Sequence, residues 1–277
     1  MAQPIVGLVA CTSGGFMSSA RDIHIEKRVA EVRVDHVTIG SATRAILVRP
    51  ADHGRRDHRP GILWLHWLGH NRGDSGQFLP EAIGLAREGV VSLLPQGTFP
   101  WHSDPTGGST DAARVLQQLH EVEHALAALR RLPDIDPGNV AVVGHDYGAM
   151  YALLLRDAAA KLLVAATPDA DWATWFLTYW PLHPADRQSY ARTLAGLSPL
   201  EAAASYGPRL FLQWAGKDEY VGDQVPALYA NAAPKARAVT YDYDHQLGDT
   251  AITERVAALR AALIGGQQTA PAVAARR

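Results

Sequence analysis

The chain has 277 residues and a hydrophobic fraction of 47%, which is enough to form the core of one large domain. Its formal net charge of −2 gives no electrostatic basis for binding nucleic acid or an anionic membrane. The single cysteine, Cys11, excludes a disulfide bond within the chain, and no apolar run reaches the roughly 18–20 residues that a membrane helix needs.

The two ends of the chain differ from the rest in composition. The apolar stretch IVGLVACTSGG near the start has no Lys or Arg before it, whereas a secretory signal carries a positive charge there. We therefore expect an N-terminal arm over residues 1–25 and a cytoplasmic protein, with export through the lipobox-like LVAC as the alternative. The small and polar stretch GGQQTAPAVAARR predicts a disordered tail over residues 265–277.

Strand patterns dominate the first part of the predicted domain. KRVAEVRVDH (27–36) and VTIGSATRAILVRP (37–50) alternate with a period of two residues, as antiparallel strands do. The continuous apolar run ILWLHW (62–67) predicts a strand buried on both faces. GQFLPEAIGLAREG (76–89) then predicts a helix, and VVSLLP (90–95) predicts the next strand.

Strands and helices alternate over the remaining sequence. A long amphipathic helix is expected from Asp111 to Leu132. The later expected elements are the strands NVAVVG (139–144), KLLVAAT (161–167), RLFLQWAG (209–216) and ARAVTYDYDH (236–245), and the helix DTAITERVAALRAALI (249–264). This order predicts an α/β domain over residues 26–264, with a mostly parallel central sheet and helices on both faces.

Residues 168–206 interrupt this alternation. The segment is much longer than the usual connection of about 2–6 residues. It is rich in aromatic residues, namely Trp172, Trp175, Tyr179, Trp180 and Tyr190. We predict a short helical lid beside an apolar site. A packed helical excursion without a ligand is the alternative.

The stretch AVVGHDYGAMYALLL carries the pattern G-x-D-x-G between a predicted strand and a predicted helix. In the nucleophile elbow of α/β hydrolases the pattern is G-x-S-x-G, and its glycines permit a sharp turn that exposes the central side chain. Here the central residue is Asp146. Asp218 and His245 follow later strands, in the chain order of nucleophile, acid and histidine, at the sheet edge where catalytic groups gather. We predict a catalytic triad of these three residues.

These motifs resemble the α/β-hydrolase superfamily over about residues 29–264. VGHDYGAMYA is similar to the elbow of epoxide hydrolases and haloalkane dehalogenases, which use an aspartate nucleophile. ILWLHWLG, LLPQGTFPW, GKDEYV and YDYDHQL resemble the dienelactone-hydrolase-like branch. The resemblance implies an α/β-hydrolase fold and hydrolysis without a cofactor or metal. Where an epoxide hydrolase has H-G-x-P, this chain reads His66-Trp67-Leu68-Gly69.

A carboxylate nucleophile is ionised without a base and attacks an sp³ carbon, which gives an alkyl ester on the enzyme. Water activated by His245 would then attack the ester carbonyl, with the backbone N–H groups of Tyr147 and Trp67 as the expected oxyanion hole. We expect an epoxide hydrolase for an apolar small molecule. A haloalkane dehalogenase, a dienelactone-hydrolase-like esterase or lactonase, and a catalytically idle binding protein are the alternatives. A homodimer is compatible with the sequence.

The expected substrate-binding residues are aromatic or lie near the predicted oxyanion loop: Tyr179, Tyr190, Trp175, His66 and Trp101. The two tyrosines are candidate acids for epoxide opening, by resemblance to the lid tyrosines of epoxide hydrolases. Asp171 is a rival to Asp218 for orienting the histidine. His120 and His124 match the zinc motif H-E-x-x-H, but no third ligand follows, so we expect no metal.

Overall fold

A computed structural model describes residues 24–29, 32–40, 42–51, 58–69 and 75–265. The predicted tail from residue 266 and the predicted arm up to residue 23 lie outside the described residues. The strands are β1 (His24–Val29), β2 (Val32–Ile39), β3 (Thr43–Pro50), β4 (Arg59–Leu65), β5 (Val91–Pro95), β6 (Ile135–His145), β7 (Leu163–Ala166), β8 (Leu210–Ala215) and β9 (Arg237–Tyr241).

The helices alternate with the strands from β4 onward, as the sequence pattern indicates. They are α1 (Leu79–Ala86), α2 (Thr110–Arg130), α3 (Tyr147–Leu154), α4 (Trp172–Tyr179), α5 (Arg187–Leu194), α6 (Pro199–Ala203), α7 (Val225–Ala232) and α8 (Asp249–Leu263), with 3-10 turns η1 (Ala195–Leu197) and η2 (Gly207–Arg209). Helix α7, which was not predicted from the sequence, lies between β8 and β9 and has Pro226 in its first turn.

The strands form one sheet in the order β1-β2-β3-β5-β4-β6-β7-β8-β9. Strands β1, β2, β3 and β5 pair antiparallel, and the pairs from β5 through β4 to β9 are parallel. The antiparallel start and the parallel continuation are both as predicted. Because parallel strands direct their carboxyl ends to one edge, the loops after β4, β6, β7, β8 and β9 meet there.

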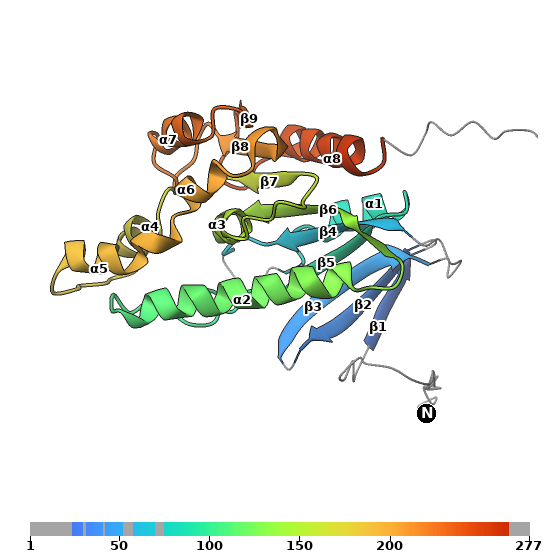
Figure 1. The fold of residues 1–277 in the computed structure, drawn as a ribbon, viewed down its shortest axis with the longest axis horizontal. Helices are drawn as coiled ribbons and strands as arrows, with labels where there is room; N and C mark the ends of the chain where they lie inside the picture. The colour runs from blue at the N-terminus through green and yellow to red at the C-terminus, as the bar shows by residue number, and fades with distance from the viewer. Residues whose placement is uncertain (1–23, 30–31, 41, 52–57, 70–74, 266–277) are drawn as a thin grey trace, which may run out of the picture.

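Two hydrophobic cores lie on opposite faces of the sheet. Residues alternate between them along β4, with Leu63 and Leu65 in one core and Ile62 and Trp64 in the other. Helices α2 and α3 cover the first face, and α1 and α8 cover the second (Figure 1). Every described residue of β4 is buried, which explains its continuous apolar sequence.

The aromatic insertion after β7 folds into helices, with α4 and α5 extending beyond the end of the parallel strands (Figure 1). Trp172, Trp175 and Phe176 of α4 are buried and belong to the same core as α3. The insertion is therefore packed firmly on the domain, close to the edge where the strand ends meet.

Candidate active site

Asp146 lies at a sharp turn between β6 and α3. Its backbone has φ 58° and ψ −124°, a conformation that residues other than glycine rarely adopt. The flanking glycines are needed for close packing, because a Cβ on Gly144 would lie 2.4 Å from the Gly148 oxygen and a Cβ on Gly148 would lie 2.1 Å from the Leu65 oxygen. The G-x-D-x-G sequence thus forms a tight elbow with a buried carboxyl at its centre.

The two oxygens of Asp146 have different surroundings. Oδ2 accepts a hydrogen bond of 2.8 Å from the backbone N–H of Leu68. Oδ1 is buried and has no hydrogen-bond partner among the described residues. Burial raises the pKa of Asp146 to about 7, although the charge of His245 and the backbone N–H groups of Leu68 and Tyr147 act in the opposite direction. The carboxyl therefore has one oxygen that accepts a backbone hydrogen bond and one oxygen without a hydrogen-bond partner among the described residues.

The prediction that Trp67 supplies an oxyanion-hole N–H is wrong. The N–H of Trp67 donates to Oε1 of Gln77 at 2.9 Å, and the N–H of the next residue, Leu68, reaches Asp146 instead. Successive N–H groups point in different directions after a strand ends, so a shift of one residue changes which group reaches the carboxyl. The backbone N–H of Tyr147, the other predicted donor, lowers the pKa of the Asp146 carboxyl.

His245 follows β9 and contacts Asp218, which follows β8. Nδ1 of His245 donates to Asp218, with distances of 2.9 Å to Oδ1 and 3.0 Å to Oδ2. Burial disfavours the imidazolium, but the hydrogen bond to Asp218 and the charges of Asp146 and Asp218 outweigh it, so the pKa of His245 is raised. With its proton on Nδ1, the neutral ring has Nε2 as its basic atom.

Asp218 and its rival Asp171 have different roles in the structure. Burial disfavours the Asp218 carboxylate, but the hydrogen bond and charge of His245 and the backbone N–H groups of Val221 and Tyr220 together outweigh it, so the pKa of Asp218 is lowered. Asp171 caps α4, where its side chain accepts from the N–H of Thr174 at 2.7 Å. Asp218 is therefore the acid that orients the imidazole.

A hydrogen-bond chain that the sequence analysis missed links the oxyanion loop to the histidine loop. Gln77 accepts from the N–H of Trp67 and contacts Nδ1 of His145 at 2.5 Å through its own Nε2. Nε2 of His145 then donates to the backbone oxygen of His245 at 2.9 Å. Burial holds the pKa of His145 well below its usual value, so this ring is neutral. These hydrogen bonds fix the oxyanion loop and the histidine loop relative to each other.

A cavity of about 440 Å³ opens over Asp146 and His245. Six of its lining residues are aromatic, namely Trp67, Tyr147, Trp175, Tyr179, Trp180 and Tyr220. Asp104 also lines it and accepts a hydrogen bond from Nε1 of Trp180 at 3.0 Å. Glu219 and Gln246 line it as well, so the cavity combines aromatic rings with polar side chains, as small-molecule sites do.

The structure places only some of the expected substrate-binding residues at this cavity. Trp175 and Tyr179 line it, and the Tyr179 hydroxyl donates to the backbone oxygen of Tyr220 at the adjoining loop. Tyr190 is not a lining residue, because its hydroxyl donates to Asp111 at 2.8 Å and fastens α5 to α2. The prediction of Tyr190 as a substrate-binding residue is therefore wrong.

His66 and Trp101 lie behind the oxyanion loop instead of in the cavity. Nδ1 of His66 and Nε1 of Trp101 both donate to the backbone oxygen of Trp67, each at 2.8 Å. Nε2 of His66 accepts from the N–H of Gly97 at 3.0 Å, and burial lowers the pKa of His66 to about 4. Both residues shape the loop that carries Leu68, so their prediction as substrate-binding residues is wrong.

The H-E-x-x-H stretch lies on α2, and both His120 and His124 are exposed. Within the described ranges, no group of three or more His, Cys, Asp or Glu side chains is arranged to hold a metal ion. Among the described helices, none has the length and apolar character needed to cross a membrane.

Comparisons with known proteins identify the fold. No protein-family model matches the chain, and no curated protein matches it in sequence. An acetyl xylan esterase from Paenibacillus sp. R4 superposes with a TM-score of 0.67 at 19% identity, over 86% of this chain and 88% of the esterase. A putative dienelactone hydrolase from Klebsiella pneumoniae subsp. pneumoniae MGH 78578 superposes with a TM-score of 0.59 at 14% identity, over 84% of this chain and 98% of the other.

A third similar structure is acetyl xylan esterase 1 from Thermoanaerobacterium sp. JW/SL YS485, with a TM-score of 0.60 at 13% identity over 86% of this chain and 87% of the esterase. Together with the sheet topology, these similarities show that the chain has the α/β-hydrolase fold, which confirms the predicted fold class. At such low identities the likeness establishes the fold, and the reaction has to be argued from the site.

Proposed function

We propose that the protein is a hydrolase that opens an epoxide on an apolar small molecule through a covalent ester with Asp146. The observation that carries this proposal is that the two oxygens of the Asp146 carboxyl have different surroundings. Oδ2 is held by the N–H of Leu68, whereas Oδ1 has no partner in the described part of the chain and belongs to a residue that lines the cavity. In an attacking carboxylate, one oxygen forms the bond to the substrate, and the other is held by a hydrogen-bond donor.

Attack by Oδ1 on an sp³ carbon forms an alkyl ester in which Oδ2 becomes the carbonyl oxygen. His245 then removes a proton from water, and the resulting hydroxide attacks the carbonyl carbon of Asp146. The N–H of Leu68 stabilises the negative charge that develops on Oδ2, the N–H of Tyr147 adds to the field that favours charge on the carboxyl, and Asp218 stabilises the imidazolium. Collapse of the tetrahedral intermediate releases the alcohol oxygen, which takes the proton from His245.

Esterase activity is the second candidate, because the similar structures include two acetyl xylan esterases. Attack of a carboxylate on an acyl carbon gives an anhydride, which is a high-energy intermediate, whereas attack on a strained epoxide carbon gives a stable ester. An aspartate at the elbow therefore favours the epoxide. The six aromatic cavity residues favour an apolar substrate.

A single-turnover reaction in ¹⁸O-labelled water tests the covalent route with the unmodified protein. Excess protein would be mixed with styrene oxide as the probe, and both the diol and the peptide that contains Asp146 would be analysed by mass spectrometry. We expect ¹⁸O in Asp146 and unlabelled diol in the first turnover, because water attacks the carboxyl carbon. Label that enters the diol directly would refute the ester.

The raised pKa of Asp146 predicts the pH profile of the reaction. Attack requires the carboxylate, so kcat/KM for styrene oxide should rise about tenfold per pH unit below pH 7 and level off above it. The raised pKa of His245 bears on kcat instead, because the base of the later hydrolytic step must be neutral. A profile that is flat between pH 5 and pH 8, measured under initial-rate conditions, would show that Asp146 is ionised throughout and would contradict this prediction.

A further inference from the structure

Two buried polar atoms without hydrogen-bond partners belong to residues that line the cavity. They are Oδ1 of Asp146 and the hydroxyl oxygen of Tyr147. The other unpartnered buried side-chain atoms in the described part of the chain belong to residues that do not line this cavity. A buried hydroxyl without a hydrogen-bond partner is destabilising, so an unpartnered donor on the residue that directly follows an unpartnered nucleophile calls for a functional explanation.

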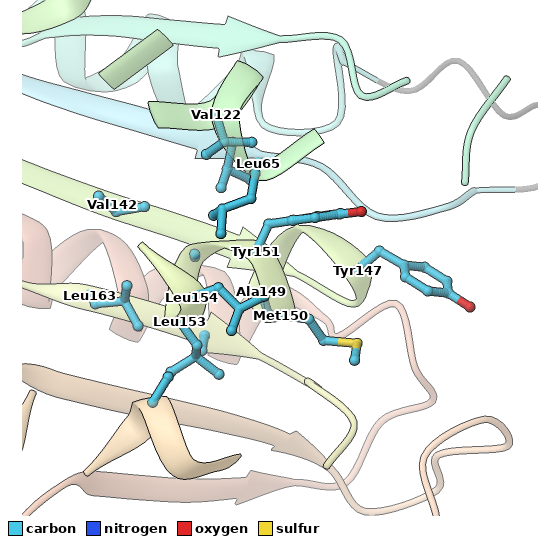
Figure 2. Close-up of a cluster of buried hydrophobic side chains, with 14 of the residues drawn as sticks. Leu65, Val122, Val142, Tyr147, Ala149, Met150, Tyr151, Leu153, Leu154 and Leu163 are labelled. Atoms are coloured by element: carbon cyan, nitrogen blue, oxygen red, sulfur yellow. The ribbon is translucent and has the colours of Figure 1, made fainter. Parts of the chain in front are cut away.

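The ring of Tyr147 is held in place by its neighbours. It stacks on Trp175 with a centroid distance of 4.4 Å and an interplanar angle of 16°, and Phe176 and Trp172 lie at 6.1 and 5.9 Å. Figure 2 shows the ring extending away from Leu153, with the hydroxyl at its far end. The residue is 2% exposed, so the position of the hydroxyl is fixed by packing.

Three other tyrosines near the site have hydroxyls that already have acceptors, and Tyr220, which also lines the cavity, is 37% exposed and is therefore not held by packing as Tyr147 is. Tyr179 donates to the backbone oxygen of Tyr220, and Tyr190 donates to Asp111. Tyr151, one helical turn after Tyr147, donates to the backbone oxygen of Phe99 at 2.9 Å. None of these three groups can serve a ligand without giving up an existing hydrogen bond, whereas the Tyr147 hydroxyl can.

We propose that Tyr147 is the acid that protonates the leaving oxygen of the epoxide while Oδ1 of Asp146 attacks the carbon. This inference rests on the proposed function and deepens it, because it specifies that the leaving atom is an oxygen that needs a proton. It replaces the lid tyrosines as the acid. The same residue thus contributes its backbone N–H to the oxyanion hole and its side chain to ring opening.

The proton balance of the cycle closes with these groups alone. In ring opening, a C–O bond of the epoxide breaks, a bond forms between the carbon and Oδ1, and the Tyr147 proton moves to the epoxide oxygen, which leaves a phenolate. Hydrolysis of the ester consumes one water and leaves Asp146 as a carboxylic acid beside a diol. Transfer of that acid's proton to the phenolate restores both groups, and the net reaction is epoxide plus water to diol.

Proton donation matters for an oxygen leaving group and much less for a halide, which departs as a stable anion. The test uses this difference. In a His245→Gln background, where the ester should persist, the rate of alkylation of the Asp146 peptide would be followed by mass spectrometry. The two electrophiles are styrene oxide and its close analogue 2-phenylethyl bromide.

Adding Tyr147→Phe should slow alkylation by styrene oxide by about 10²–10⁴-fold, the usual contribution of an acid, and alkylation by the bromide by less than about tenfold. The ring and its stacking remain, so the variant should fold, which thermal melting would check. Tyr151→Phe is the matched control: it also removes one buried hydroxyl from α3, outside the cavity, and should leave both rates unchanged.

Three results would overturn the assignment in distinguishable ways. Unchanged alkylation by styrene oxide would show that Tyr147 is not the acid. Equal slowing with both electrophiles would assign the residue to packing. Absence of an Asp146 adduct from either electrophile in the His245→Gln parent would contradict the proposed function itself, and the role of Tyr147 with it.

Discussion

Asp146→Ala should reduce turnover of an epoxide by about 10⁴-fold or more, to the background rate. The variant lacks the only group at the elbow that can form the covalent bond, while the glycines that shape the turn remain. Steady-state kinetics with styrene oxide would measure the loss. Residual activity within about tenfold of the parent would contradict the covalent scheme.

The Asp146→Ala substitution should also change the stability of the fold, by an amount that depends on pH. The pKa of Asp146 is about 7 in the folded protein against an ordinary value of 3.8, so the folded state binds this proton more tightly than the unfolded state. Its contribution to stability is present below about pH 4 and is lost as the pH rises to 7. The free energy of unfolding of Asp146→Ala, relative to the parent, should therefore rise by a few kcal/mol over this range.

Urea denaturation at several pH values between 4 and 8 would measure this difference. The pH dependence is more informative than the value at one pH, because the lost hydrogen bond with Leu68 acts on the variant at every pH. A difference that does not change with pH would mean that burial does not oppose ionisation of Asp146. In that case the predicted pH profile of the reaction would fail as well.

Asp218→Asn should lower turnover by about 10³–10⁴-fold, as removal of the orienting carboxylate does in other triads. The variant weakens His245 as a base, because an amide can present the wrong partner to Nδ1 and cannot stabilise the imidazolium. Formation of the ester does not use His245, so it should proceed within about tenfold of the normal rate. The ester should then accumulate during turnover, which rapid quenching and mass spectrometry would detect.

Asp171→Asn is the control for this prediction. Asparagine caps a helix about as well as aspartate, so α4 should remain intact and turnover should be unchanged. Loss of activity in Asp171→Asn together with normal activity in Asp218→Asn would show that Asp171, and not Asp218, orients His245.

The parts of the structure that could be predicted from sequence depend on local patterns. The continuous apolar run of β4 indicates burial on both faces, and the order of Asp146, Asp218 and His245 follows from the strand that precedes each residue. The two glycines of the elbow indicate a turn that a Cβ would block. In each case a few neighbouring residues carry the information.

The errors arise where the answer depends on which side chain of a segment faces the cavity. The N–H that reaches Asp146 belongs to Leu68 instead of the predicted Trp67, because Gln77, ten residues after Trp67, accepts the Trp67 N–H. Tyr190 does not line the cavity, because its hydroxyl donates to Asp111 on α2. Such contacts join distant parts of the chain and leave no periodic signal, so a list of aromatic residues in a lid cannot separate the lining residues from the packing ones.

The most direct test of the central claim is intact-protein mass spectrometry of His245→Gln after incubation with styrene oxide. The substitution removes the base for ester hydrolysis and leaves Asp146 in place. We predict a mass gain of one epoxide molecule per chain, mapped by peptide analysis to Asp146. If no adduct forms while the unmodified protein converts the same epoxide to its diol, Asp146 is not the nucleophile and the covalent route is wrong.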